Sequence, residues 1–174
     1  LRKLTSKDVK GCAVLMRYTL RLLTTQQFQR ASSLICACEK IRRENKEILG
    51  DERISIGLWI GSEATPNREK DAKFLLEDLI ENPNYITKNK FILLNCPWCN
   101  TELPPKQGRT FNGYKIVKKK FFYVCSNKEC SFSKDELHLP VTVIDESIYS
   151  NPPTLLIGTI DKFASLSWLS DAIS

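Results

Sequence analysis

Short apolar runs and helix-spaced apolar residues alternate along the first part of the chain. The run Cys12–Arg17 follows Gly11 and is nearly all apolar, which is typical of a strand buried on both faces of a parallel sheet. Apolar side chains then recur at intervals of three and four, which predicts an amphipathic helix, and Thr24 with Gln27 forms a candidate capping box at its start. The helical positions are Phe28, Ala31, Leu34, Ile35, Cys38 and Ile41.

A second strand and helix follow the same order. The run Ile54–Ile60 is again almost entirely apolar and is closed by Gly61 and Ser62. The Thr65-Pro66 pair has the form of an N-cap followed by proline in the first helical turn, and the helix is expected to run through about Ile80, where the Asn82-Pro83 pair stops it. Strand, helix, strand, helix predicts an α/β fold with a parallel sheet and flanking helices.

The pattern changes between residues 88 and 135. This stretch is rich in turn residues and holds four cysteines, with short strand-like runs at Tyr114–Val117 and Phe121–Cys125. We therefore interpret 88–135 as an inserted, zinc-ribbon-like subdomain, and residues 1–87 with 136–174 as the α/β domain that carries it.

Strand-like and helical patterns resume after the insertion. Apolar runs at Leu139–Ile144 and Leu155–Gly158 predict two more strands, and a final helical stretch is expected through Phe163, Leu166 and Leu169.

The cysteines of the insertion have the spacing of a metal site. Cys96 and Cys99 form C-x₂-C, and Cys125 and Cys130 form C-x₄-C after a gap of 25 residues. Zn²⁺ prefers a tetrahedron of soft ligands, and a C-x₂-C turn aims two thiolates at one point. A thioredoxin-like redox pair would leave the second pair of cysteines unexplained. His138, the only histidine, is an alternative ligand, although a surface or strand-edge position suits it better once four cysteines are available.

Such a site would be closed and structural. An insertion of this size has too small a core to fold alone, so metal binding would supply much of its stability. Cys36 and Cys38 lie two residues apart and would point in different directions on a helix, so we interpret both as buried thiols.

Charge narrows the class of partner. The 174-residue chain has a net charge of +6, and Lys and Arg outnumber Asp and Glu by 11 to 4 in residues 1–47 and by 10 to 2 in residues 84–134. Two basic blocks in a chain that is otherwise acidic favour a polyanion. Lys115 and Lys118–Lys120 can either meet phosphates or offset a dianionic zinc–cysteine centre. No run approaches the length of a membrane helix and no signal peptide is visible, so a cytoplasmic protein without a membrane partner is expected.

Two strand-to-helix turns carry polar side chains where open α/β sheets bind ligands. Arg17 to Arg21 follows the first strand, and Thr159 to Lys162 follows the last. A hydroxyl and free backbone amides at a helix start, beside a cation, form a phosphate cradle.

These turns, in their order, carry a resemblance to a known family. "RYTLRLLTTQ", "LWIGS" and "LIGTIDKF" resemble motif Ia, the following glycine turn and motif Ib of the first RecA-like motor domain of superfamily 2 helicases. Together with "NCPWCNTEL" and "LPVTVIDESIY", they look closest to the helicase-like subunit of DISARM-type bacterial anti-phage systems. The resemblance implies a partial RecA-like domain that holds a nucleic-acid backbone, with DNA the expected form. By position the contacts fall on Arg17, Tyr18, Thr19, Arg21, Gln26, Gly158, Thr159, Asp161 and Lys162.

The resemblance also implies what this chain needs from elsewhere. The chain contains no G-x-x-x-x-G-K-[ST] phosphate loop and no D-E-x-H segment after the motif Ib-like turn. We therefore expect a fragment that is inactive alone. ATP and Mg²⁺ would be bound only in a full-length helicase, which would act with partner subunits of the defence system. One alternative is a non-enzymatic zinc-ribbon module for protein or nucleic acid. Another is a metal-dependent nuclease using Asp145 and Glu146, for which the structural alternative is that one of them caps the turn toward Ile148 and Tyr149.

Overall fold

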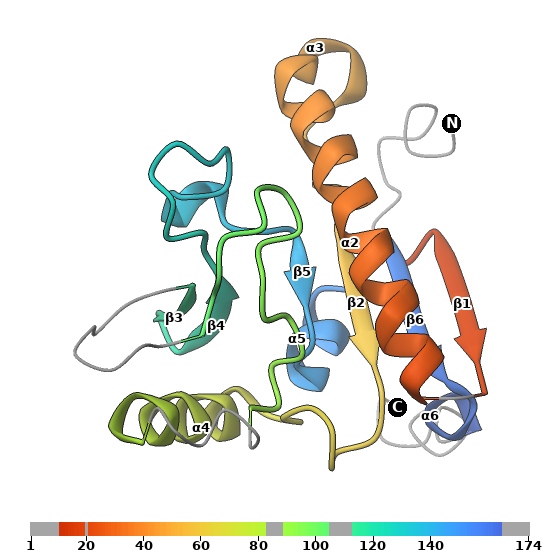
Figure 1. Cartoon of the computed structure of the whole chain (residues 1–174). Helices are drawn as coiled ribbons and strands as arrows, with labels where there is room; N and C mark the ends of the chain where they lie inside the picture. Colours follow the sequence, from red (N-terminus) through yellow and green to blue (C-terminus); the bar gives the residue numbers. More distant parts are fainter. Residues whose placement is uncertain (1–10, 20, 83–88, 105–112, 165–174) are drawn as a thin grey trace.

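The computed structural model describes residues 11–19, 21–82, 89–104 and 113–164, except for the side chains of residues 21–24. One four-stranded parallel sheet organises the chain (Figure 1), in the order β1-β6-β2-β5. The strands are β1 (Val14–Tyr18), β2 (Ile56–Trp59), β5 (Val141–Thr142) and β6 (Leu155–Thr159). The predicted α/β fold with a parallel sheet flanked by helices is confirmed.

Alternating side chains of the central strands bury both faces of the sheet. Ile56, Leu58 and Ile157 face the core that includes Phe28 and Ile35 of α2 (Arg21–Glu44). Trp59 and Leu156 point to the opposite face, where Ile148 of α5 (Asp145–Ser150) and Phe163 of α6 (Ile160–Ala164) cover them. The buried strand predicted at Ile54–Ile60 is confirmed over Ile56–Trp59, whereas Ile54 and Ser55 are half-buried and precede it.

The strand β1 departs from the prediction. It pairs only with β6 and forms an edge of the sheet, and its Val14, Leu15 and Met16 side chains are 50%, 55% and 37% exposed. The expectation that this run is buried on both faces is wrong for the described structure. An apolar run alone carries no information about strand order, which places the edge here.

Two helix starts were predicted at the wrong residues. Helix α2 begins at Arg21, so Thr24 and Gln27 lie inside it rather than at its cap. Helix α4 (Glu69–Glu81) begins after Arg68, because Thr65 is fully buried in the preceding turn. A short helix, α3 (Lys46–Leu49), follows α2, and α4 ends at Asn82 as expected.

The first turn of α4 is capped from α5. Glu146 Oε2 accepts a hydrogen bond from the backbone N–H of Glu69 at 3.0 Å, whereas α5 itself has no side-chain cap. Glu69 in turn accepts hydrogen bonds from the Phe121 backbone N–H at 2.7 Å and from the Ser147 hydroxyl. The prediction that Asp145 or Glu146 caps its own turn is wrong, and Glu146 instead ties two helices together.

The cysteine-rich region contains the antiparallel hairpin of β3 (Tyr114–Val117) and β4 (Lys120–Tyr123), close to the predicted strands. Lys118 and Lys119 form its two-residue turn with φ of 49° and 66°. Two positive φ values match a type I′ turn, in which glycine and asparagine are the usual residues. A short 3₁₀ helix, η2 (Asp135–Leu137), leads back to the sheet.

This region shares its core with the sheet. Phe91 stacks on Phe121 with ring centroids 4.2 Å apart, and both belong to the cluster that contains Leu58 and Leu76. Buried hydroxyls are satisfied inside it, since Tyr114 donates to the Leu93 carbonyl at 2.8 Å. Burial of these aromatics therefore stabilises the hairpin and the sheet together. The boundaries at 88 and 135 stay a prediction.

Candidate metal centre and sheet-edge site

The first cysteine pair lies on a tight turn. Cys96 donates its backbone N–H to the Thr101 carbonyl at 2.7 Å, and its own carbonyl accepts from Asn100 at 2.8 Å. Asn100 has a positive φ of 62°, a conformation that asparagine tolerates better than most residues. The turn brings Cys96 and Cys99 to the same side.

The second pair is held by a similar turn after β4. Cys125 donates its N–H to the Phe132 carbonyl at 2.8 Å, and Cys130 donates to the Asn127 carbonyl at 3.0 Å. The Asn127 side chain also accepts from the Glu129 N–H at 3.0 Å. Both turns are therefore fixed by backbone hydrogen bonds.

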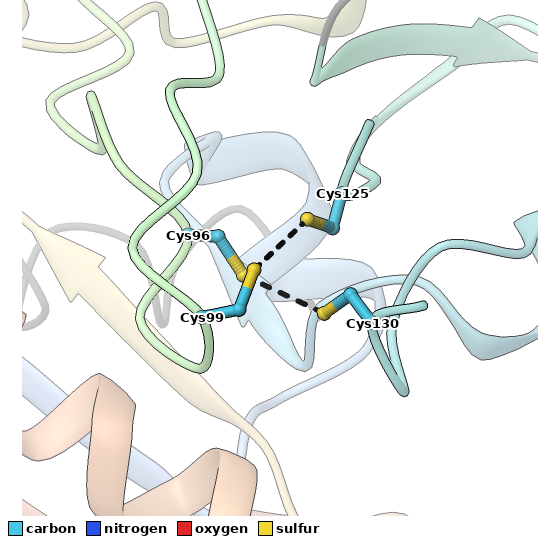
Figure 2. A group of neighbouring side chains, drawn as sticks. All are labelled: Cys96, Cys99, Cys125 and Cys130. Atoms are coloured by element: carbon cyan, nitrogen blue, oxygen red, sulfur yellow. Dashed lines mark hydrogen bonds between the residues drawn. The ribbon is translucent and has the colours of Figure 1, made fainter. Parts of the chain in front are cut away.

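The four sulfur atoms converge (Figure 2), and all lie within 4.8 Å of one another. The Sγ atoms of Cys96 and Cys130 are 3.9 Å apart, and those of Cys99 and Cys125 are 3.4 Å apart. A tetrahedron of thiolates around a metal with bonds of about 2.3 Å has sulfur separations of about 3.8 Å. The four predicted ligands are thus arranged so that they can hold one metal ion.

Burial and hydrogen bonding affect these thiols differently. Burial raises the pKa of Cys96, although the backbone N–H groups of Cys99 and Trp98 act against it, and burial raises the pKa of Cys130 to about 12. Burial also acts to raise the pKa of Cys99, but hydrogen bonds from Thr101 outweigh it and lower this pKa to about 7. A metal ion would remove the remaining protons, because a coordinating thiol is deprotonated outright.

Other candidate ligands lie outside this cluster. His138 has its Nδ1 2.9 Å from the Asp135 carbonyl and its Nε2 2.5 Å from Arg53 Nη1, and its ring packs against Phe122. Cys36 is buried as predicted, whereas Cys38 is only half-buried.

Helix α2 packs against the metal-site turns through cations. The Arg43 guanidinium lies 4.4 Å from the centre of the Phe132 ring and donates to the Ser131 carbonyl at 3.3 Å. Lys40 lies 6.0 Å from the ring centre of Trp98, which stands between the first two cysteines. The turns are therefore anchored to the same helix that covers the sheet.

The two polar turns predicted to hold a nucleic-acid backbone lie side by side. In the parallel pairing of β1 with β6, Arg17 is opposite Gly158 and Tyr18 is opposite Thr159. Arg17, Thr19, Gln26 and Asp161 are exposed, and Tyr18 is half-buried. Arg21 is the first residue of α2, and its side chain lies outside the described part of the structure.

Three of the predicted contact residues, two at the end of β6 and one in α6, are largely buried within the fold. Lys162 Nζ lies 2.5 Å from Asp145 Oδ2, and the Lys162 side chain is 16% exposed. Burial raises the pKa of Asp145, and the Lys162 ammonium opposes that rise. The Thr159 hydroxyl is buried without a hydrogen-bond partner in the described structure. Gly158 packs so closely that an added Cβ would lie 2.9 Å from the Trp59 carbonyl oxygen.

The acidic pair Asp145 and Glu146 does not form a metal site in the described structure. Asp145 is paired with Lys162, and Glu146 caps α4. Within the described ranges, the four cysteines are the one group of three or more His, Cys, Asp or Glu side chains arranged to hold a metal ion.

Sequence reasoning missed a buried charged layer on α2. Glu39, 2% exposed, accepts two hydrogen bonds of 2.8 Å from Arg42 and one of 2.9 Å from the Ile54 N–H. These contacts lower the pKa of Glu39 even though burial acts to raise it. Charged residues on a helix usually lie on a solvated face, so the sequence does not predict their burial. The one signal for an ion pair is the three-residue spacing of Glu39 and Arg42, which places them side by side on a helix.

Comparison with known proteins gives a similarity that covers most of the chain. No protein-family model matches the chain. The chain is 38% identical over 91% of its length to the DISARM protein DrmA of Bacillus paralicheniformis, of which it spans 14%. Among the described helices, none has both the length and the apolar character needed to cross a membrane. The chain is therefore similar to one segment of a much longer DISARM protein.

Proposed function

We propose that this chain is a segment of a DISARM-type phage-defence protein, in which a partial RecA-like helicase domain contacts a nucleic-acid backbone. The similarity to the DISARM protein DrmA supports the defence role. The observation that carries the backbone contact is the pairing of β1 with β6, which puts Arg17, Thr19 and Asp161 around one edge of the sheet. Carboxyl ends of parallel strands are where such sheets bind ligands.

The backbone contact is tested by binding to single-stranded DNA at low salt. Arg17→Ala is expected to weaken binding and to reduce its dependence on salt, because phosphate contacts release counterions and carry no base information. Lys70→Ala, which removes an exposed lysine of α4 outside the proposed interface, is the matched control. Equal affinities for Arg17→Ala and the unmodified protein would contradict the proposal.

We further propose that the four cysteines hold a structural Zn²⁺. Four cysteines are a ligand set that zinc takes in closed structural sites, and the turns leave no described non-cysteine ligand at the centre. Metal analysis of protein purified without added zinc should give one zinc per chain. Substoichiometric zinc with four freely reacting thiols would contradict it. ATP and Mg²⁺ belong to the full-length protein, since this chain has no phosphate loop.

A second candidate function is a zinc-ribbon module that binds a partner subunit or nucleic acid without catalysis. Lys118, Lys119 and Lys120 are exposed at the hairpin tip, and the first two adopt a turn that suits other residues better, which favours a surface role. Replacing all three with glutamate discriminates the candidates. Loss of DNA or partner-subunit binding in this variant, with DNA binding intact in Arg17→Ala, supports the second function. Intact binding in this variant, with weakened DNA binding in Arg17→Ala, supports the first.

A further inference from the structure

The interior beside the cysteine cluster holds more positive than negative charge. Glu39 is matched by the two hydrogen bonds of 2.8 Å from Arg42. Arg43 and Arg53 remain, and burial lowers the pKa of Arg53 only to about 10, so its guanidinium is charged at neutral pH. The closest described partners of Arg53 are the ring and carbonyl of His138, which carry no negative charge. Arg43 also pairs with Glu39, so three guanidinium groups and one carboxylate leave an excess of two positive charges.

Arg43 is the one that touches the metal-site loop. Its side chain is 20% exposed, lies 3.3 Å from Glu39 Oε1 and contacts Ser131 and Phe132, the two residues after Cys130. Its Nη2 is buried and has no hydrogen-bond partner among the described residues. Because Arg42 also pairs with Glu39, this one carboxylate compensates two guanidinium groups only in part, and a buried charge that is not compensated costs free energy.

A divalent metal bound by four thiolates would supply the missing charge. Four thiolates carry −4 and the ion +2, which leaves a centre of −2 on the loop that Arg43 contacts. We propose that Arg43 is the electrostatic partner of this dianionic centre and sets its metal affinity. The proposal rests on the proposed zinc centre and names a positioning residue for it. Partners outside the first ligand shell raise metal affinity by about 10- to 100-fold.

The test measures Zn²⁺ affinity by competition with a chromogenic chelator. Arg43→Met keeps an unbranched side chain over Phe132 but removes the charge, and it is expected to weaken Zn²⁺ binding by about 10- to 100-fold. Arg43→Lys restores the charge and should recover most of the affinity. Arg30→Met is the control, because Arg30 is an exposed arginine of the same helix that lies 13 residues before Arg43, and it should leave the affinity unchanged.

A change in ligand charge separates electrostatics from packing. Cys99→His gives a centre of −1, and because Coulomb energy scales with charge, Arg43→Met should then cost only about 3- to 10-fold. A purely structural role would cost the same in both backgrounds and would overturn the inference, as would native affinity in Arg43→Met. If the unmodified protein binds no Zn²⁺, the proposed zinc centre itself fails, which is a separate result.

Discussion

The single histidine should make the stability of this protein depend on pH in a way that can be isolated. His138 is held neutral, because its Nδ1–H donates to the Asp135 carbonyl at 2.9 Å and its Nε2 faces Arg53 Nη1 at 2.5 Å. A proton on Nε2 would meet the guanidinium. Burial first, and then Arg53, lower the pKa of His138 from 6.5 to about 4.

The size of this pH effect follows from the difference between the ordinary histidine pKa of 6.5 and the pKa of about 4 in the folded protein. Since folded His138 binds its proton less tightly than unfolded histidine, the stability it contributes is complete above pH 6.5 and is lost as pH falls through about 4. The full contribution is at most about 3 kcal/mol, of which about 2 kcal/mol is lost by pH 5. His138→Gln, which does not titrate, should lack this part of the pH dependence.

The assay compares free energies of chemical unfolding at pH 7 and pH 5 for the two proteins. Contributions common to both, including protonation of the cysteine ligands, cancel in the difference. Proton NMR reads the same pKa directly, because one histidine gives one ring C–H signal to follow. Equal pH dependence in both proteins, or a measured His138 pKa near 6.5, would refute the reasoning.

Three further predictions concern packing, capping and the metal. Gly158→Ala should destabilise the protein by about 1–3 kcal/mol, because the added Cβ would lie against the Trp59 carbonyl oxygen. Thermal unfolding measures this change. Unchanged stability with lost DNA binding would assign Gly158 to the nucleic-acid interface instead. Glu146→Ala should cost about 0.5–2 kcal/mol in chemical unfolding by uncapping α4 at Glu69, and an unchanged midpoint would contradict this. Cys125→Ser should release the metal and expose core aromatics to a hydrophobic dye; retained metal would contradict it.

Local patterns predicted much of this fold. The apolar run at Ile54–Ile60 identified β2, because both faces of a central parallel strand require apolar side chains. The spacing of Cys96 with Cys99 identified half of the candidate metal site for a similar reason, since one short turn fixes both side chains. Such features depend on residues that are close together in the chain, so they can be predicted from the sequence alone.

Features that depend on distant contacts were not predictable. The cap of α4 comes from Glu146, 77 residues after Glu69, so the Thr65-Pro66 pattern predicts a cap that the helix does not use. Strand order left β1 at an edge although its residues are apolar. The unmatched charge of Arg43 emerges only when α2 packs against the loop that carries Cys130.

The central place of β6 has a consequence for synthesis on the ribosome. β1 and β2 both pair with β6 and not with each other, although they are made some 100 residues or more before it. Until Leu155–Thr159 leave the exit tunnel, β1 has no partner in this sheet. The nascent chain therefore carries an open apolar strand while the residues between β1 and β6 are made, which is the kind of unpaired edge that chaperones shield from aggregation.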